Sequence, residues 1–357
     1  MICSKNEGST HRRKRLSRNT LFILVARARV YSPYFNHTIP TNRFPSHTVV
    51  FTVRAPSKGE KILKAHPDIP RSRLSYTLVP DITSPNAFHS AVQSTPPFDS
   101  VIHTASPFHY KAENAQRDLI DPAVLGTTSL LTAVAAHAPS VKRVVITSSF
   151  AAIYNPHKHP ETGIYTEEHW NPVTLDEAMK DPIQGYRASK TFAERAAWEF
   201  LEREHPPLFF TIATINPPLI LGPLMKGVHS KETINTSNTQ LCDLVEGKWK
   251  DGLPRTFAPY WVDVRDVALA HVRALEREGA AQKRFIVTAG TMCNAQIATI
   301  VREQVPEMGG LRPATFESDL PADLYGADTA RSREILGLEY RTLQECVVDS
   351  LRVLSDV

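Results

Sequence analysis

The chain has 357 residues, of which 42% are hydrophobic and 22% are charged, close to the average for soluble globular proteins. It contains no run of about 18 apolar residues, so no membrane-spanning segment is expected. Its four cysteines are scattered without a C-x-x-C pair, which argues against a disulfide framework or a structural zinc site and suits a reducing compartment.

The net charge of +4 is unevenly distributed along the chain. Residues 1–46 carry nine Lys or Arg residues and one acidic residue, so the rest of the chain is mildly acidic and gives no support to nucleic-acid binding. The basic segment has the composition of a mitochondrial transit peptide, but a disordered arm or a wrongly assigned start of the coding sequence would look the same. A cytoplasmic location is expected, with mitochondrial targeting as the alternative.

From residue 47 onward, short apolar runs alternate with helical patterns. The runs predict strands at 47–53, 74–79, 98–105, 141–149 and 209–217. Helices are predicted from Ser57, over 84–93, over 121–138 with Pro122 in the first turn, and over 185–200. This alternation predicts an α/β fold with a parallel sheet covered on both faces, and right-handed crossovers make it a doubly wound, Rossmann-like sheet.

After Pro217 the sequence changes character. Residues 218–260 show little periodicity around a helix near 232–247, and a helix at 262–278, a strand at 283–290 and two or three final helices follow. We therefore expect three parts. These are an atypical basic segment at 1–46, a Rossmann-type cofactor-binding and catalytic core at 47–217, and a small lobe at 218–357 that mainly binds substrate and returns some elements to the core.

Small and polar residues follow three predicted strands, at the edge where open α/β sheets bind ligands. They are HTASP at 103–107, TSS at 147–149 and NPPLILGP at 216–223. Tyr186 and Lys190 share one face of the next helix, and a neighbouring ammonium favours the phenolate, so the pair can act as a general acid near neutral pH. A Tyr and a Lys at this spacing also occur by chance, and serine-rich turns are common. The combination indicates an enzyme.

In these segments the sequence resembles the extended short-chain dehydrogenase/reductases. The resemblance is to the dihydroflavonol-4-reductase-like branch, which includes NADPH-dependent methylglyoxal and ketone reductases. The matching stretches are VIHTASPF, RVVITSSFAAIY, DPIQGYRASKTFAERAAWEFLE, INPPLILGP and YWVDVRDVALAHV. With the rhythm between them they cover residues 47–354, and they are more specific for the family than for a substrate.

The resemblance implies catalytic roles for Ser149, Tyr186 and Lys190. Tyr186 would donate a proton to the carbonyl oxygen as hydride arrives from the nicotinamide, and Ser149 would hydrogen-bond the same oxygen. Lys190 would bind the nicotinamide ribose and lower the pKa of the tyrosine. Many relatives carry an Asn that completes a proton relay, but the aligned residue here is Leu125, so the relay must run through water or be absent.

Arg54 follows the strand at 47–53, where NAD-preferring Rossmann enzymes carry an acidic residue for the ribose hydroxyls. An Arg there, with Lys58 one turn further on, suits the 2′-phosphate of NADP, although taken alone the two residues are an ordinary basic turn. NADPH is therefore the expected cofactor. Asp81 and Ile82 match positions that line the adenine pocket. The other expected cofactor contacts are Thr104, Ala105, Ser106, Tyr186, Lys190, Pro217 and Leu219.

The N-terminal segment departs from the family pattern. The family opens with a strand and a G-x-x-G-x-x-G loop that lets a helix N-terminus approach the pyrophosphate, but the only glycine before Gly59 is Gly8. LFILV at 21–25 stands roughly where the first strand belongs, and the usual crossover helix after it is disfavoured by Pro33, Pro40 and Pro45. We expect a first βα unit that is atypical or missing. Either a wrongly assigned exon replaces it, which we favour, or the chain is a genuine variant with impaired cofactor binding.

Other candidate residues carry less information. His157 and His159 lack further ligands at zinc spacing, so we interpret them as part of an exposed loop and expect no metal site. Phe108, Tyr260 and Trp261 suit a hydrophobic substrate pocket or a core equally well.

The leading interpretation is an NADPH-dependent enzyme that reduces a ketone or aldehyde in a small organic molecule, with secondary metabolism as one setting. Two alternatives stay open. One is a nucleotide-sugar epimerase or dehydratase of the same fold. The other is a catalytically silent NADP-binding homologue, which the missing glycine loop supports. The expected partners are a small carbonyl substrate and, in a homodimer, a second copy of the chain; a monomer is equally consistent, and neither nucleic acid nor membrane is expected.

Overall fold

The computed structural model describes residues 20–24, 47–106, 112–155, 157, 159–203, 208–225, 234 and 236–354. Within them lies a seven-stranded sheet in the order β10-β7-β5-β4-β1-β2-β3, and every neighbouring pair of its strands is parallel. The strands are β1 (Thr20–Leu24), β2 (Thr48–Val53), β3 (Leu74–Leu78), β4 (Ser100–His103), β5 (Arg143–Thr147), β7 (Thr211–Asn216) and β10 (Lys283–Ile286). The predicted Rossmann-like α/β fold is confirmed.

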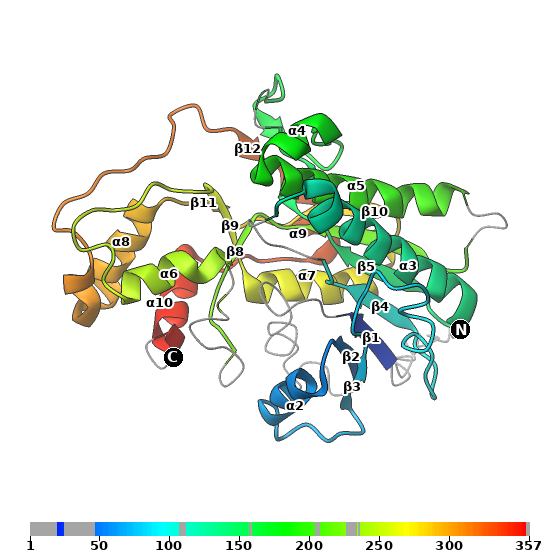
Figure 1. Cartoon of the computed structure of the whole chain (residues 1–357). Helices are drawn as coiled ribbons and strands as arrows, with labels where there is room; N and C mark the ends of the chain where they lie inside the picture. Colours follow the sequence, from blue (N-terminus) through cyan, green and yellow to red (C-terminus); the bar gives the residue numbers. More distant parts are fainter. Residues whose placement is uncertain are drawn as a thin grey trace, which may run out of the picture.

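The strand expected near 21–25 is β1, and it lies inside the sheet between β4 and β2 (Figure 1). Leu21 is in register with Val49 of β2 on one side and with Ser100 of β4 on the other. The chain passes outward through β2 and β3 and then returns to the other side of β1, so the strand order reverses between β1 and β4. Such a reversal opens a crevice for ligands at the carboxyl edge of the sheet. The first strand is thus not missing, whereas residues 25–46 lie outside the described residues.

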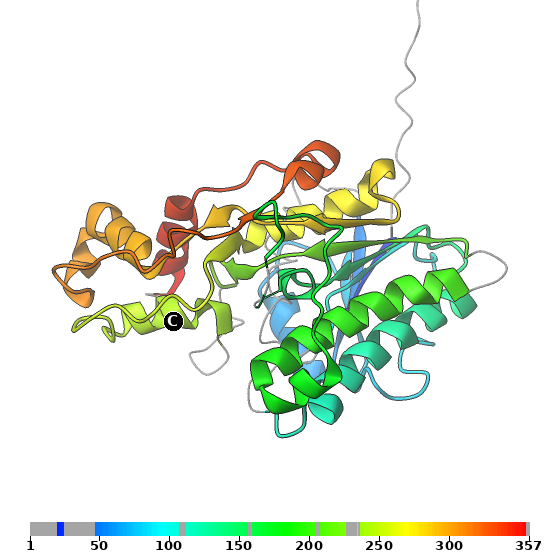
Figure 2. The same cartoon turned by 90° about the horizontal axis from the view of Figure 1, so that it is seen from above.

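Helices cover both faces of the sheet (Figures 1 and 2). Successive side chains of a strand point to opposite faces, so in β4 Val101 belongs to one hydrophobic core and Ile102 to the other. The first core lies under α3 (Asp121–His137) and α5 (Pro182–Arg203), and the second under α2 (Pro56–Lys64) and α7 (Val264–Glu276). Burial on both faces explains the continuous apolar runs of the strands.

Residues beyond β7 form a smaller lobe beside the sheet and also return elements to it (Figure 1). A three-stranded sheet joins β11 (Gly290–Thr291), β9 (Tyr260–Asp263) and β8 (Leu219–Leu221). The lobe also holds α6 (Thr239–Val245), α8 (Asn294–Gln304) and α10 (Leu343–Leu354), whereas α7, α9 (Ala330–Leu336) and β10 lie against the core. The remaining elements are β6 (Ile164–Tyr165) paired with β12 (Gly326–Ala327), α4 (Leu175–Lys180), a π-helix at Gln116–Ile120, and 3-10 helices at Phe150–Ala152, Thr236–Asn238, Glu278–Ala280 and Pro306–Leu311.

Two predicted helices differ in the structure. Residues 84–93 form successive turns, because Asn86 adopts a φ of 61° in the left-handed region, which interrupts a right-handed helix. In the described part of 232–247, the expected helix is reduced to the 3-10 turn at Thr236–Asn238 and the short helix α6.

The stretch Gln116–His137 is long and apolar enough to cross a membrane by length and composition alone. The sequence pattern predicted no such stretch, because polar residues interrupt its apolar run. Half of its most apolar window is buried in the fold, where Leu130, Leu131 and Val134 are inaccessible to solvent. Core helices of soluble proteins have the same character, and packing against the sheet explains the composition.

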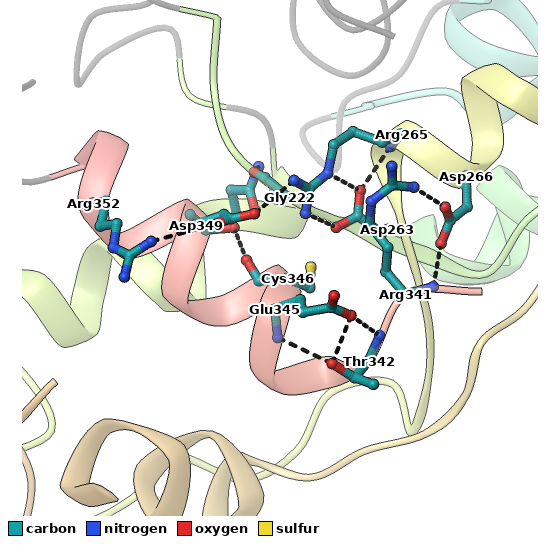
Figure 3. A network of polar contacts seen from close by, with 12 residues as sticks. Gly222, Asp263, Arg265, Asp266, Arg341, Thr342, Glu345, Cys346, Asp349 and Arg352 are labelled. Atoms are coloured by element: carbon teal, nitrogen blue, oxygen red, sulfur yellow. Dashed lines mark hydrogen bonds and ion pairs between the residues drawn. The ribbon is translucent and has the colours of Figure 1, made fainter. Parts of the chain in front are cut away.

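A polar network joins α10 to the start of α7 (Figure 3). The fully buried Asp263 caps α7 by accepting a hydrogen bond from the backbone N–H of Arg265 at 2.7 Å, and its Oδ2 lies 2.7 Å from Nη2 of the same residue. Nη1 of Arg265 lies 2.6 Å from Oδ2 of Asp349 on α10. Nearby, Arg341 donates to Asp266 of α7 from both its backbone and its side chain. These ion pairs fasten the C-terminal helix to the corner between β9 and α7.

Candidate active site

The ends of β5 and β7 meet at the carboxyl edge of the sheet and hold one serine between them. Ser149 is the N-cap residue of the 3-10 helix after β5, and its Oγ accepts a hydrogen bond from the backbone N–H of Ala151 at 3.1 Å. The carbonyl of Pro217, after β7, accepts from Ser149 Oγ at 3.5 Å and from the N–H of Phe150 at 2.9 Å. The serine hydroxyl is therefore fixed by contacts from two strand ends.

The first turns of α5 bring Tyr186 and Lys190 to the same place. Tyr186 Oη donates a hydrogen bond to Ser149 Oγ at 3.4 Å, and Lys190, one turn further on, is 6% exposed. Gly185 allows α5 to pack closely here, because a Cβ at this position would stand 2.8 Å from the Cβ of Ala115. The structure thus brings the three predicted catalytic residues together around one cavity.

Burial dominates the electrostatics of this cluster. It raises the pKa of Tyr186, and the hydrogen bond with Ser149 opposes that rise. It lowers the pKa of Lys190 to about 8, and the carboxylate of Glu194 opposes that change. In this structure the pKa of Tyr186 lies above its ordinary value, with burial as the largest cause, and the lowering of that pKa by Lys190 stays a prediction. A tyrosine with a raised pKa is protonated at neutral pH, as a proton donor must be.

The cavity has a volume of about 550 Å³ and lies between the sheet edge and the C-terminal lobe. Its sheet side carries Thr104, Ser106, Ser149, Phe150, Ala151, Tyr186, Lys190, Pro218 and Leu219. Its other walls come from Tyr154, His159, Ile183, Arg187, Thr236, Ser237 and the segments 255–260, 319–321 and 323–325. The hydrogen bonds from the N–H and Oγ of Thr256 to Asp319, both at 2.6 Å, tie two of these segments together.

An aromatic column forms a wall of the cavity. The ring of Tyr325 lies between those of Tyr154 and Tyr260, with centroid distances of 4.9 Å to each and interplanar angles of 24° and 22°. The ring of His159 also stacks on that of Tyr325, with a centroid distance of 4.6 Å. Tyr260 lines the cavity, and its Oη is buried without a hydrogen-bond partner among the described residues. The sequence left Tyr260 open between pocket and core, and it missed Tyr154 and Tyr325.

Other predicted residues have separate outcomes. Trp261 is 3% exposed and packs in the core, and Phe108 lies outside the described residues. His157 and His159 lie on an exposed loop as expected, although His159 also lines the cavity. Among the described residues, no group of three or more His, Cys, Asp or Glu side chains is arranged to hold a metal ion. Leu125 is 47% exposed and does not line the cavity, so it supplies no part of a proton relay.

The expected nicotinamide-side residues lie beside Lys190. Thr104, Ser106 and Leu219 line the cavity, and Ser106 Oγ is buried without a hydrogen-bond partner among the described residues. Ala105 is 4% exposed and packs in the core. Pro217 contributes its carbonyl to Ser149, and the next residue, Pro218, lines the cavity in its place.

The expected adenosine-side residues lie away from the cavity, beyond β2 and β3. Asp81 Oδ1 accepts hydrogen bonds from the backbone N–H and the hydroxyl of Thr83, which lower the pKa of Asp81, and the charge of Arg54 adds to the effect. Lys58 lies exposed on α2. Ile82 is 3% exposed in the core, and a Cβ on Gly126 of α3 would stand 2.8 Å from it, so this side chain is occupied by packing. The contact of Ile82 with the adenine stays a prediction.

A doubly wound parallel sheet, a serine at a strand end and a Tyr–Lys pair on the following helix define the extended short-chain dehydrogenase/reductase class. Residues 36–289 match the NAD dependent epimerase/dehydratase family, and the chain belongs to this family.

Relatives in sequence and in structure agree with this assignment. The chain is 43% identical to the ketoreductase azaE of Aspergillus niger over 307 residues, which cover 85% of this chain and 89% of that protein. It is 34% identical to the NADPH-dependent methylglyoxal reductase GRE2 of Saccharomyces cerevisiae over 310 residues, covering 85% and 90% of the two chains. The crystal structure of Gre2 from Candida albicans in complex with NADPH superposes with a TM-score of 0.85 at 32% identity, over 95% of this chain and 99% of that one.

Proposed function

We propose that this chain reduces a ketone or aldehyde group in a small organic molecule and uses NADPH as the reductant. The observation that carries the proposal is the meeting of Ser149, Tyr186 and Lys190 at one cavity. The printed activities of the relatives, a ketoreductase and an NADPH-dependent methylglyoxal reductase, support both the reaction and the cofactor.

The residues on the sheet side of the cavity fit the nicotinamide end of NADPH. Lys190 makes no hydrogen bond from its ammonium to another described residue, and it faces the cavity. The unpartnered hydroxyl of Ser106 lies in the same wall. Buried polar groups of this kind are normally satisfied by a partner, and a bound ribose or carboxamide offers one.

The three residues Ser149, Tyr186 and Lys190 have different roles in the proposed reaction. When bound, NADPH supplies the hydride that adds to the carbonyl carbon. Ser149 Oγ hydrogen-bonds the carbonyl oxygen, and Tyr186 Oη donates its proton to that oxygen as negative charge develops there. The resulting phenolate is stabilised by the Lys190 ammonium in a site largely shielded from water.

Arg54 and Lys58 support the choice of NADPH over NADH. Both lie just beyond β2, where a Rossmann fold binds the adenosine ribose, and an Arg there suits the dianionic 2′-phosphate. Residues 25–46, between β1 and β2, lie outside the described residues.

Two measurements test the proposal. NADPH titration of the whole chain, followed by fluorescence, tests binding, and NADPH oxidation with diketones, methylglyoxal and a flavonoid-type ketone tests turnover. We expect saturable binding and turnover with at least one carbonyl, and Tyr186→Phe should abolish turnover with little change in NADPH affinity. An absence of binding at millimolar NADPH contradicts the proposal. Saturable NADPH binding without turnover on any of these carbonyls supports the silent NADP-binding homologue, which the lack of glycines after Gly8 in residues 1–46 favours. Binding of a UDP-sugar supports the epimerase alternative.

A further inference from the structure

A buried carboxylate lies directly beside the proposed catalytic residues. Glu194 is on α5, one turn beyond Lys190, and is 2% exposed. Residues four apart on a helix lie on the same face, so the carboxylate and the ammonium are neighbours. Burying a carboxylate is costly unless hydrogen bonds and opposite charge compensate it, so its surroundings must be specialised.

Four donors surround the two oxygens of Glu194. Oε1 accepts from Thr214 Oγ1 at 2.9 Å and from Arg284 Nε at 2.6 Å. Oε2 accepts from Asn216 Nδ2 at 2.7 Å and from Ser148 Oγ. Two carboxylate oxygens offer four lone-pair positions, so the hydrogen-bonding capacity of Glu194 is filled. The donors come from β7, β10 and the end of β5, and the carboxylate therefore ties α5 to three adjacent parts of the sheet.

These contacts bracket the backbone of Ser149. Ser148, which donates to Glu194, precedes it in the chain. Asn216, which also donates to Glu194, uses the same amide nitrogen to reach the carbonyl of Ser149 at 3.2 Å. The next residue, Pro217, accepts from Ser149 Oγ. The residue before Ser149 in the chain and the residue that binds its carbonyl thus both donate to Glu194, which lies on the helix that carries Tyr186.

The charges around Glu194 also have fixed partners. The guanidinium of Arg284 lies 3.7 Å from the ring of Trp170 and donates to the carbonyls of Glu167 and His169 at 2.6 Å and 2.7 Å, whereas its Nη2 has no hydrogen-bond partner among the described residues. His103 lies at the end of β4, close enough to Lys190 for their charges to interact. Burial and the charge of Lys190 lower the pKa of His103 to about 3, so its ring is neutral. Glu194 is therefore the charged group near Lys190 that favours the ammonium.

We propose that Glu194 is a positioning residue, which fixes Ser149 against Tyr186 and keeps Lys190 positively charged. The inference rests on the proposed function for its catalytic consequence, but its structural part concerns the chain alone. An amide cannot replace the carboxylate, because the NH₂ group of Gln would face two donors at either oxygen position, and the negative charge would be lost.

The main test compares Glu194→Gln with a matched control, Glu167→Gln. Glu167 is also a buried carboxylate; its Oε1 accepts from the N–H of Ile286 at 3.1 Å, and its side chain does not contact Ser149. For Glu194→Gln we expect kcat to fall by roughly 10- to 100-fold with little change in the KM for NADPH. The decline of kcat at alkaline pH should move to lower pH by roughly half a unit or more, since Lys190 loses a nearby negative charge. Glu167→Gln should lower the melting temperature but leave the pH profile in place.

A second variant covers the case in which Glu194→Gln does not fold. Glu194→Asp keeps the charge but shortens the side chain by one methylene, so we expect a lower kcat with the alkaline decline unmoved. Wild-type kcat in folded Glu194→Asp, or a wild-type kcat and pH profile in folded Glu194→Gln, overturns the inference.

A readout without turnover separates the inference from the proposed function. Lysine carrying ¹³C at Cε reports protonation by NMR, and Lys190→Arg assigns the signal. The titration midpoint of Lys190, about 8 in the wild-type chain, should fall in Glu194→Gln and stay in Glu167→Gln. If the wild-type chain reduces no carbonyl, the proposed function fails, while an unshifted midpoint in Glu194→Gln overturns the inference about Glu194.

Discussion

Tyr186 and Ser149 are 37 residues apart in the sequence, yet Tyr186 Oη donates a hydrogen bond to Ser149 Oγ at 3.4 Å. The contact joins α5 to the turn after β5, and the carbonyl of Pro217 fixes the serine from the other side. A substrate oxygen placed beside the two hydroxyls meets two donors that the fold already holds in position. Donors oriented in advance are worth most in a site shielded from water, which makes the serine a sensitive point for mutation.

Replacing Ser149 with Ala should lower kcat by roughly 100- to 1,000-fold, because one donor to the developing oxyanion is lost. The NADPH dissociation constant should change little, since Lys190 and the other nicotinamide-side residues stay in place. Steady-state kinetics with the best carbonyl of the panel measures kcat, and a fluorescence titration measures the NADPH dissociation constant. A variant that weakens NADPH binding as strongly as turnover would assign Ser149 to the cofactor instead.

The aromatic column should select for flat substrates. Tyr325→Ala removes the ring that stacks on both Tyr154 and Tyr260, so the KM for an aromatic ketone should rise roughly tenfold. The KM for methylglyoxal should rise less, because a small substrate leaves most of the wall untouched. Tyr325→Phe keeps the ring and serves as the control. Equal effects of Tyr325→Ala on both substrates speak against a role of the column in selectivity.

Arg54 should discriminate between the two nicotinamide cofactors. Arg54→Gln should weaken NADPH binding by roughly 10- to 100-fold, because a charge-assisted contact with the 2′-phosphate is lost, and should leave NADH binding nearly unchanged. Lys61→Gln, which changes an exposed basic residue of the nearby helix α2, is the control. Parallel titrations with NADPH and NADH measure the difference. Equal losses of affinity for both cofactors would contradict a contact between Arg54 and the 2′-phosphate.

Buried His271 should make the fold sensitive to mild acid. Its Nδ1 lies 2.7 Å from the carbonyl of Val267 and its Nε2 lies 2.6 Å from Thr147 Oγ1, so the neutral ring donates to the first and accepts from the second. Burial lowers its pKa from 6.5 to about 4. The unfolded chain therefore binds the proton first, and stability is present above pH 6.5 and is lost as the pH falls toward 4.

Thermal unfolding measures this dependence. The melting temperature should fall between about pH 7 and about pH 5, and the fall should be smaller in His271→Gln, which has no proton to gain. Buried His103, whose pKa is also lowered, should maintain part of the acid sensitivity in that variant. The same slope in the wild-type chain and in His271→Gln contradicts the assignment.

Two ion pairs in the network of Figure 3 should differ in how much their loss lowers the free energy of unfolding. Arg265→Met leaves the fully buried Asp263 without its guanidinium, which should lower the free energy of unfolding by about 3–5 kcal/mol. Asp349 is 36% exposed, and Asp349→Ala leaves Arg265 paired with Asp263, so the loss should be about 1 kcal/mol or less. Urea unfolding of the two variants gives the comparison, and equal losses would show that Asp263 needs no buried partner.

Much of the fold was predictable because its signals are local. Continuous apolar runs indicated the buried parallel strands, and even the short run at 21–25 is a strand, β1, although the glycine loop that normally follows it has no counterpart in the sequence. The helix predicted at 84–93 was wrong because a single residue, Asn86, adopts a left-handed conformation that periodicity does not register. Local patterns thus predict elements well where burial on two faces is uniform, and less well where one backbone angle decides.

The sequence by itself determined the chemistry: strand-end hydroxyls and a Tyr–Lys pair at helical spacing define which groups Ser149, Tyr186 and Lys190 present. Only the tertiary structure decided their setting. Tyr325 meets Tyr154 and Tyr260, and Glu194 meets Arg284, across distances in the chain that carry no periodic signal. Only the tertiary structure likewise showed that burial raises the pKa of Tyr186, because desolvation depends on everything packed around a group and not on its neighbours in sequence.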